Sequence, residues 1–307
     1  MDHLTGNNFL LNLLVDPESG GRLLFDQVSN TLVSAKSGNK FSLIESVPRI
    51  IIGENQNIMK SGIHREYDSY FNYIDHYQKD AVLSDYSESN LPGITKDEIR
   101  RLHESIIKEI TDEMSLILDI GCGNGWASKK LIPSGKKVIS MDISSDNPVK
   151  AVREVPHENH AGLIADAYNI PLMENSVDCI IASEILEHVP DPMTMITGMI
   201  KLLKHKGKLI ITVPYNEKIE YNLCVHCNRP TPRFAHLHSF NENNIVRFIP
   251  EKGITWKSKR FINKYLLQIR SHVILKLLPF SYWKHIDNFF NMLFNKQVRL
   301  QLVILKL

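Results

Sequence analysis

The sequence feature that most constrains the fold is a short apolar run that opens directly into a glycine-rich turn. The run is Leu116–Ile120, and the turn reads Gly121-Cys122-Gly123-Asn124-Gly125. A second apolar run, Lys137–Met141, ends at Asp142. Glycines let a loop turn tightly and let backbone N–H groups approach a ligand closely. The pattern therefore predicts two strands of an open sheet whose ends hold a nucleotide-type ligand.

Further apolar runs follow at intervals, and helical patterns such as Pro192–Leu203 and Glu242–Phe248 separate several of them. The runs are Gly162–Ala165, Val177–Ala182, Lys208–Val213, Ile254–Phe261 and Val298–Leu305. Strands that alternate with helices predict an α/β fold, with a largely parallel sheet covered on both faces. We place this domain at residues 113–307, with insertions at 215–240 and 262–296.

The chain before residue 113 has a different pattern. Residues 1–53 contain short apolar pieces separated by turn residues, which predicts a small β-rich domain built of hairpins. The pieces are Leu10–Val15, Leu23–Phe25, Thr31–Val33, Phe41–Ile44 and Arg49–Ile52. Residues 54–112 are expected to form a helical cap or linker. Within them, Thr95-Lys96-Asp97-Glu98 predicts a capping box that opens a helix running toward Ile110.

The composition of the chain argues against several classes of function. The 307 residues are 43% hydrophobic and 23% charged, as expected for a soluble globular protein. The net charge of +2 provides no global basic field to indicate nucleic acid as a partner. The start, Met1-Asp2-His3, lacks the basic and apolar segments of a secretory signal, and no run approaches the ~18 apolar residues that span a bilayer. The four cysteines do not suggest a disulfide framework, so we expect a cytoplasmic protein.

The glycine spacing differs from the dinucleotide fingerprint G-x-G-x-x-G, because the third glycine comes one residue early. Asp119 also precedes the loop, where a carboxylate repels a pyrophosphate and suits a ligand that bears an ammonium group. In this combination, residues 115–307 resemble the class I S-adenosylmethionine-dependent methyltransferases. The resemblance implies a Rossmann-like seven-stranded sheet and S-adenosylmethionine as the cofactor.

The resemblance extends to later segments. Asp142 takes the position that binds the ribose, and Asp166 the position that accepts from the adenine amine. Ser183–Val189 resembles the segment after the fourth strand that lines the methyl-donor pocket. The cofactor-binding residues that the resemblance implies are Asp119, Gly121, Cys122, Gly123, Gly125, Asp142, Ile143, Asp166, Ala167 and Glu184.

Candidate catalytic residues come from the same segment. A general base is needed only if the attacking group still carries a proton at neutral pH. His188 and Glu184 are the candidates, with His236 and His238 as further imidazoles that titrate near neutrality. The alternative for Glu184 and His188 is that they only shape the pocket, as a helix cap or a hydrogen-bond partner.

A cluster of potential metal ligands lies in the first insertion. Cys224 and Cys227 are followed by His236 and His238, and two sulfurs with two imidazoles are a ligand set of structural Zn²⁺. The spacing is tighter than in a standard zinc finger. A metal-free loop and a disulfide are the alternatives. The insertion follows the end of a strand, so it borders the ligand crevice in each case.

The N-terminal domain resembles the small Trm112-type zinc-ribbon-like domain through the spacing of Leu23, Leu32, Phe41 and Pro48. The four cysteines of that family would fall at Asp16, Ser19, Ser34 and Ser37. Carboxylate and hydroxyl groups do not rebuild a thiolate zinc site, so we expect a degenerate, metal-free domain. It would act in substrate or partner docking, or serve only as a structural appendage.

The second insertion, Ile262–Lys296, is basic and aromatic. Such a stretch can contact an anionic membrane surface or cover an acceptor, and extra helices packed on the domain are the alternative. We expect an S-adenosylmethionine-dependent methyltransferase that methylates an oxygen of a small molecule, a sugar or a lipid-linked glycan. Ala182-Ser183-Glu184 stands where base amino-group methylation requires Asn/Asp-Pro-Pro-Tyr, which argues against nucleic acid. The alternatives are an RNA-modifying methyltransferase and a non-catalytic protein that binds the cofactor.

Overall fold

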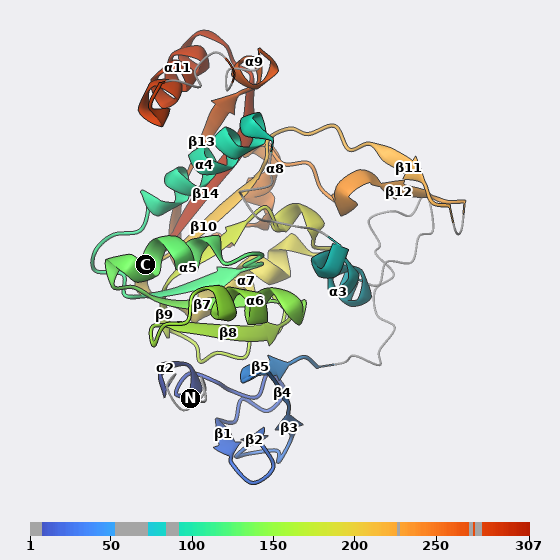
Figure 1. Ribbon diagram of the computed structural model, residues 1–307, viewed down its shortest axis with the longest axis vertical. Helices are drawn as coiled ribbons and strands as arrows, with labels where there is room; N and C mark the ends of the chain where they lie inside the picture. Colours follow the sequence, from blue (N-terminus) through green and yellow to red (C-terminus); the bar gives the residue numbers. More distant parts are fainter. Residues whose placement is uncertain (1–7, 53–72, 84–91, 226–227, 270–272, 274–277) are drawn as a thin grey trace.

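The computed structural model describes residues 8–52, 73–83, 92–225, 228–269, 273 and 278–307. Its centre is a sheet of nine described strands in the order β13-β14-β10-β9-β6-β7-β8-β5-β4 (Figure 1). The strands are β4 Leu43–Ile44, β5 Val47–Ile50, β6 Leu116–Ile120, β7 Lys137–Asp142, β8 His160–Ala165, β9 Val177–Ser183, β10 Leu203–Pro214, β13 Ile254–Asn263 and β14 Gln297–Lys306. The predicted α/β fold is confirmed, and β4 and β5 add two strands from the N-terminal region.

The directions of the strands determine where a ligand crevice can lie. Strands β8, β7, β6, β9 and β10 run parallel, while β14 is antiparallel to both β10 and β13. Strand β6 lies between β7 and β9, so the chain order reverses there. In open sheets of this kind, ligands bind beyond the carboxyl ends of the strands at the reversal. The glycine-rich turn after β6 occupies that position.

Helices cover both faces of the sheet, and alternate strand residues point to opposite faces. Ile117 packs with one set of helices and Leu118 with the other. The first set is α4 Gly93–Ile107, α5 Trp126–Leu131, α9 Lys264–Gln268 and α11 Phe280–Leu293. The second set is α7 Pro192–Leu202 and α8 Glu242–Ile245, and α6 Asp146–Glu154 packs on β7 and β8.

The predicted helical region 54–112 is described only in part, because residues 53–72 and 84–91 lie outside the described ranges. Its described helices are α3 Tyr73–Leu83 and α4. The capping-box prediction is wrong. Helix α4 begins at Gly93 with Pro92 as its N-cap, the Lys96 N–H donates to the Pro92 carbonyl at 3.0 Å, and Thr95 lies inside the helix. Proline before the first turn fixes a helix-compatible start earlier than Thr95.

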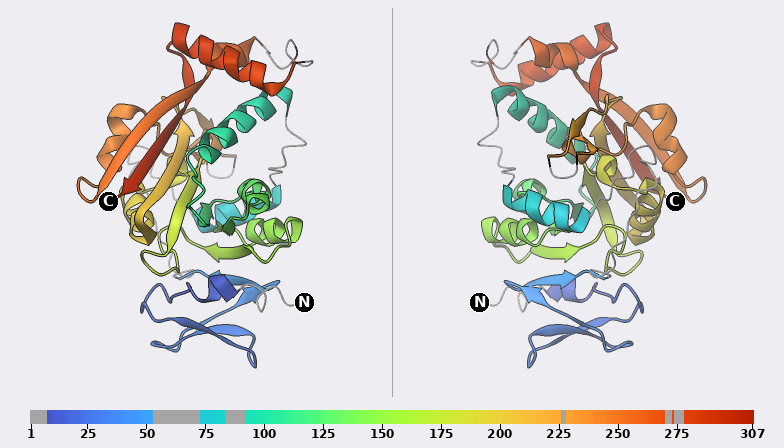
Figure 2. Two further views of the ribbon diagram at one scale, coloured as in Figure 1. Left: turned by 90° about the vertical axis from the view of Figure 1, so that its left-hand side faces the viewer. Right: turned by 90° about the vertical axis from the view of Figure 1, so that its right-hand side faces the viewer.

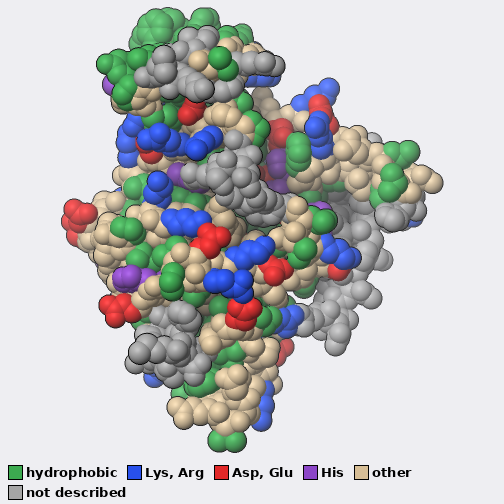
Figure 3. All heavy atoms as spheres, in the orientation of Figure 1, with side chains coloured by type: hydrophobic (Ala, Val, Ile, Leu, Met, Phe, Trp, Pro, Cys, Tyr) green, Lys and Arg blue, Asp and Glu red, His purple; other side chains and the backbone are tan. Residues whose placement is uncertain are grey.

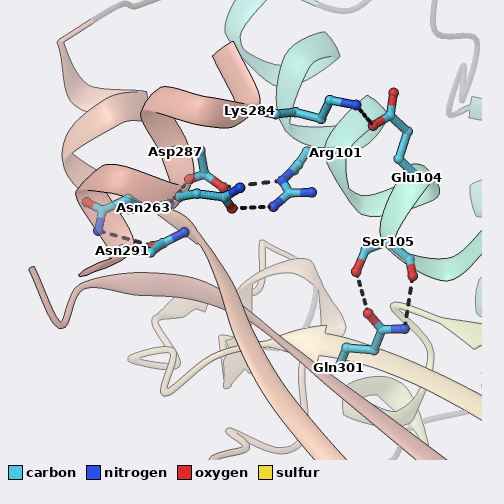
Figure 4. Close-up of polar contacts among 9 residues, drawn as sticks. Arg101, Glu104, Ser105, Asn263, Lys284, Asp287, Asn291 and Gln301 are labelled. Atoms are coloured by element: carbon cyan, nitrogen blue, oxygen red, sulfur yellow. Dashed lines mark hydrogen bonds and ion pairs between the residues drawn. The ribbon is translucent and has the colours of Figure 1, made fainter. Parts of the chain in front are cut away.

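Buried polar contacts fasten α4 to the C-terminal elements (Figure 4). Ser105 on α4 bonds to Gln301 on β14, where both side chains are buried. Arg101 Nε lies 3.3 Å from the Asp287 carboxylate on α11, which is fully buried. A buried carboxylate requires such a partner, because an unpaired charge is costly in the interior. These contacts hold α4 over the sheet beside the crevice.

The N-terminal region joins the main sheet. Strands β1 Leu23–Asp26, β2 Thr31–Ser34 and β3 Lys40–Phe41 form a separate antiparallel sheet. Strand β5 pairs in parallel with β8, with Ile50 opposite Ala165 (Figure 2). The predicted strand at Leu10–Val15 is wrong at its start, because α2 Asn8–Leu11 is helical there. Leu10 and Leu14 are buried in the main core, and this burial favours a helical turn over an extended segment.

Within this region, the four positions assigned to family cysteines converge on one carboxylate. Asp16 is fully buried, and its Oδ2 accepts hydrogen bonds from Ser19 and Ser37, each at 2.6 Å. The Ser34 hydroxyl lies 3.2 Å from that of Ser19. The resemblance to the Trm112-type domain stays a prediction, but its four ligand positions do meet in space.

The two predicted insertions differ in form. The first carries a hairpin of β11 Tyr221–Leu223 and β12 Pro230–Pro232, which projects from the body of the molecule (Figure 1). The second contains α9 and α11, and α11 packs on β13. Among the helices that the structure describes, none has both the length and the apolar character needed to cross a bilayer.

Candidate active site

The glycine-rich turn after β6 depends on conformations that favour glycine. Gly121, Gly123 and Gly125 have φ values of 67°, 48° and 68°, in the left-handed region. The N–H groups of Gly121 and Cys122 both donate to the Met141 carbonyl, at 2.8 and 3.0 Å. This pairing fixes the turn against the end of β7. A Cβ atom on Gly121 would lie 1.9 Å from Ile185 Cδ1, so the position also requires a residue without a side chain.

Two carboxyl groups flank the turn. Asp142 at the end of β7 accepts from the Ser144 N–H at 2.9 Å and from Asn147 Nδ2 at 3.0 Å, and burial raises its pKa. Asp119 on β6 is 1% exposed, and its Oδ2 has no hydrogen-bond partner among the described residues. Burial and the nearby charge of Asp142 raise the pKa of Asp119 to about 8. A cation above the turn would reverse this effect.

A cavity of about 950 Å³ lies over the carboxyl ends of these strands. Nine of the residues predicted for the cofactor and for catalysis line it: Gly121, Cys122, Gly123, Asp142, Ile143, Asp166, Ala167, Glu184 and His188. Asp119 and Gly125 do not line it. Asp119 lies at the end of β6, and Gly125 begins α5. The volume is near the top of the ~300–1,000 Å³ range of ligand pockets, which leaves room for two ligands.

Helix α3 forms one wall of the cavity and was not expected to do so. Its Tyr73 hydroxyl donates to Asp166 Oδ2, and the Tyr168 N–H donates to Asp166 Oδ1 at 3.0 Å. Gln78 on the same helix bonds to Ile143 and Ser145 in the loop after β7, at 2.7 and 2.9 Å. The sequence predicted only a helical cap or linker in this region. The bonds show that α3 is attached directly to the predicted cofactor residues.

Arg299 is a further site residue that the sequence prediction missed. It lies on β14, and its Nε is 3.1 Å from Glu184 Oε2 while its guanidinium contacts Glu98 at 2.9 Å. Glu184 has a φ of 56°, and its Oε1 has no hydrogen-bond partner among the described residues. Burial raises the pKa of Glu184, and the Arg299 charge opposes this. The charged Arg299 within the apolar part of this strand could have marked the position, although not its partners.

His188 lies in a crowded imidazole environment. Its ring packs edge-to-face on that of His236, with 4.7 Å between centroids, and on that of Tyr77 at 6.0 Å. Its Nδ1 has no partner among the described residues. Burial, together with the neighbouring His236, lowers the pKa of His188 to about 3. The ring is therefore neutral and weakly basic at pH 7, which disfavours the predicted general-base role.

The four predicted zinc ligands have separate environments where they are described. His236 Nδ1 lies 2.5 Å from Glu217, and His238 Nε2 lies 2.9 Å from the Val189 carbonyl. Cys224 directly follows β11, and Cys227 lies outside the described residues. Among the described side chains, the one group of three close metal-binding atoms joins His236 to Glu187 and His188. The Cys224, Cys227, His236 and His238 zinc site is not supported by these contacts and stays a prediction.

Several solved structures align with this chain at low identity. A putative S-adenosylmethionine-dependent methyltransferase from Listeria monocytogenes is 13% identical with a TM-score of 0.48, covering 66% of this chain and 97% of that one. An S-adenosylmethionine-dependent methyltransferase from Mesorhizobium loti is 14% identical with a TM-score of 0.48, covering 66% and 96%.

Curated relatives are more similar over a shorter stretch. The ubiquinone biosynthesis O-methyltransferase of Xanthomonas axonopodis pv. citri (strain 306) is 34% identical over 103 residues, which are 31% of this chain and 41% of that protein. That of Xanthomonas oryzae pv. oryzae (strain PXO99A) is 30% identical over 131 residues, 39% and 53% respectively. The chain spans about half the length of the curated relatives that it matches.

The methyltransferase domain family model matches residues 118–211, which run from β6 into β10. That stretch carries the glycine-rich turn, the Asp142 carboxylate and the segment around His188, all of which line the cavity. The match therefore falls on the same residues that the geometry brings together. Residues 118–211 therefore belong to the methyltransferase domain family, in agreement with the class I S-adenosylmethionine-dependent methyltransferase that the sequence resembles.

Proposed function

We propose that this chain transfers a methyl group from S-adenosylmethionine to a hydroxyl oxygen of a small-molecule acceptor. The observation that carries the proposal is one cavity shared by the predicted cofactor residues and by Glu184 and His188. The curated relatives are named O-methyltransferases of ubiquinone biosynthesis, which supports an oxygen nucleophile on a small molecule.

The residues around the turn fit the cofactor. Asp142 ends β7 beside the cavity, where its carboxylate can accept from ribose hydroxyls. The unpartnered Asp119 Oδ2 beneath the turn provides negative charge for the ammonium end. Asp166 and Ala167 line the wall assigned to the adenine. When bound there, S-adenosylmethionine supplies a methyl group activated by its sulfonium charge.

The protein's own contribution is alignment, exclusion of water and removal of a proton. Tyr77, Val189 and Phe234 give the cavity apolar walls that exclude water and orient an acceptor. Glu184 lines the same space and its Oε1 has no partner among the described residues, so we assign it the hydroxyl proton. Arg299 holds the other oxygen of that carboxyl group and keeps it in place. His188 positions the acceptor rather than acting as a base.

The test has two parts. At about 100 times its dissociation constant, S-adenosylmethionine should stabilise the folded chain by roughly 2.7 kcal/mol, and the demethylated product should compete. Transfer of a labelled methyl group should then occur to hydroxylated small molecules and not to RNA. Transfer to RNA alone would support an RNA-modifying methyltransferase, and binding without transfer to any acceptor would support a non-catalytic protein. If S-adenosylmethionine does not bind and the demethylated product does not compete, the proposal is wrong.

We further propose that residues 262–296 contact an anionic lipid surface. The described part of this segment exposes Tyr282, Phe289 and Met292 on α11, and Figure 3 shows hydrophobic side chains gathered at that end of the molecule. Exposed Lys264 and Lys296 flank them. Exposed apolar side chains beside basic ones suit an anionic interface. Sedimentation should occur with phosphatidylglycerol vesicles and weaken for Phe289→Ser; equal sedimentation of both proteins would contradict it.

A further inference from the structure

Glu187 is a buried carboxyl group to which the described residues provide no hydrogen bond. Its side chain is 1% exposed, and neither Oε1 nor Oε2 has a partner among the described residues. A buried carboxyl group in this state costs free energy unless it takes a proton or binds a cation. The backbone of Glu187, in contrast, is hydrogen-bonded. Its carbonyl accepts from the N–H groups of Leu237 and His238 at 2.7 and 3.2 Å.

These backbone bonds bring the first insertion against the segment after β9, and they place two imidazoles beside Glu187. One potential ligand atom each from Glu187, His188 and His236 lies within 4.8 Å of the others. Four ligands around a Zn²⁺-sized ion lie about 3.4 Å apart, so small side-chain rotations would close the group on an ion. Two imidazoles and one carboxylate are a set that divalent transition metals prefer.

The hydrogen bonds around the two rings leave one nitrogen of each available. The His188 ring bonds to the Ala235 backbone, and its Nδ1 is without a partner among the described residues. Glu217 bonds His236 at Nδ1, so Nε2 is the nitrogen available to an ion. A carboxylate that bonds the second nitrogen of a histidine is the usual outer contact of a metal-binding imidazole, because it fixes the tautomer and the ring orientation.

The local charge also favours a cation. Four carboxyl groups, those of Glu98, Glu184, Glu187 and Glu217, act on the single Arg299 guanidinium. Among the described residues, Arg299 makes its ion pairs with Glu98 and Glu184, and Glu187 is left outside both. A divalent ion beside Glu187 would balance this excess of carboxyl groups.

We propose that Glu187, His188 and His236 bind one divalent transition-metal ion at the wall of the cavity. His188 lines the cavity, as do Ala235 and Leu237 on either side of His236, so open coordination positions would face the acceptor. This role rests on the proposed O-methylation. A hydroxyl oxygen that enters an open position gives up its proton more readily. The proton passes to Glu184 Oε1, and the oxygen is held in place for methyl transfer.

The experiment uses the full chain after treatment with a chelator. Addition of Co²⁺ should produce visible absorption bands that saturate at one equivalent, and calorimetry with Zn²⁺ or Mn²⁺ should give the same stoichiometry. Glu187→Gln and His236→Asn should each weaken binding by about 100-fold or more. Glu217→Gln, which removes only the outer contact, should weaken it by about 10–100-fold. Unchanged S-adenosylmethionine affinity and melting temperature would confirm that these variants fold.

A matched control separates this site from the alternative ligand set. The double variant Cys224→Ser with Cys227→Ser should bind Co²⁺ as the parent does, and an exposed-histidine control, His205→Ala, should do the same. Absence of binding by the parent chain, or binding lost in the cysteine variant and kept in Glu187→Gln, would overturn the proposal. Metal binding without any methyl transfer would leave the site in place and contradict the O-methylation. Methyl transfer at an unchanged rate in Glu187→Gln would overturn the role of the ion in the reaction.

Discussion

The Ser37 hydroxyl donates a 2.6 Å hydrogen bond to the Asp16 carboxylate, across 21 residues of chain. Asp16 also accepts from the Glu18 N–H at 3.0 Å and the Ser19 hydroxyl at 2.6 Å. Asp26 makes the same pair of local bonds, to Val28 and Ser29, at the same distances. Only Asp16 of these two residues has the long-range bond and is fully buried. Asp26 therefore serves as a control, within the same chain, for the effect of that bond.

Asp16→Asn should destabilise the N-terminal region at pH 7, by about 1–3 kcal/mol, because the Ser19 and Ser37 hydroxyls lose a charged acceptor. Burial alone would raise the pKa of Asp16, but hydrogen bonds from Ser19, Ser37 and their neighbours lower it below its usual value. A depressed pKa means that this stability is present above about pH 4 and is lost as the pH falls through the folded-state value.

Thermal unfolding from pH 2 to pH 7 measures this effect. The parent chain should lose stability below pH 4, and Asp16→Asn should lose less. Asp26→Asn should lose nearly as much as the parent, because the bonds from Ser29 and Val28 lower the pKa of Asp26 but the group is exposed and has no long-range hydrogen bond among the described residues. A steep acid transition that Asp16→Asn leaves unchanged would show that other carboxylates control it.

The four converging positions predict that a metal site can be restored. Asp16→Cys, Ser19→Cys, Ser34→Cys and Ser37→Cys in one chain should bind one Zn²⁺, since Cys₄ is a complete structural zinc set. The 2.6 and 3.2 Å contacts among the present side chains place the four positions around one point. Elemental analysis of the purified variant should find one added equivalent relative to the parent. A chain that folds with no added zinc would contradict the assignment of these positions.

Asp142→Asn should weaken S-adenosylmethionine binding by about ten- to a hundredfold, since a hydrogen bond to a charged group contributes about 1.5–3 kcal/mol. Titration calorimetry measures the affinity. Asp146→Asn, a nearby change at the start of α6 that does not line the cavity, is the matched control. Equal affinities for Asp142→Asn and the parent would show that the ribose contact is assigned to the wrong residue.

Gly121→Ala should abolish cofactor binding and lower stability, because it combines backbone strain with a 1.9 Å approach to Ile185. Gly135→Ala tests strain alone, since Gly135 has a φ of 79° and nothing within 4 Å of an added Cβ. Its cost should stay near the ~1–2 kcal/mol of a left-handed alanine. Gly121→Ala with Ile185→Ala should recover part of the difference. Equal melting temperatures for Gly121→Ala and Gly135→Ala would contradict the close approach.

The strands of the sheet could be predicted because each is a continuous apolar run between turn residues. Strand β6 matches its predicted limits, Leu116–Ile120, and β7 differs by one residue at its end. Most of the residues predicted to bind the cofactor do line the cavity, for a related reason: they follow directly at the carboxyl ends of those strands. Asp142 and Asp166 are examples, and both line the cavity.

Contacts between distant segments were not predictable from local patterns. Tyr73 on α3 reaches Asp166 across 93 residues, and Arg299 on β14 reaches Glu184. Nothing near Tyr73 or Arg299 in the sequence indicates these partners. The pairing of β5 with β8 was missed for the same reason, because a short apolar strand does not reveal which edge it joins.

The position of β14 has a consequence for how the protein is made. This strand, Gln297–Lys306, lies between β10 and β13 and bonds to both, although both precede it along the chain. During synthesis, β10 and β13 cannot form their hydrogen bonds to β14 before β14 has left the ribosome. Until then, Glu184 also lacks its ion pair with Arg299. Until β14 is made, a nascent chain would therefore carry two unsatisfied strand edges, and in that interval it would be most exposed to wrong edge-to-edge pairing.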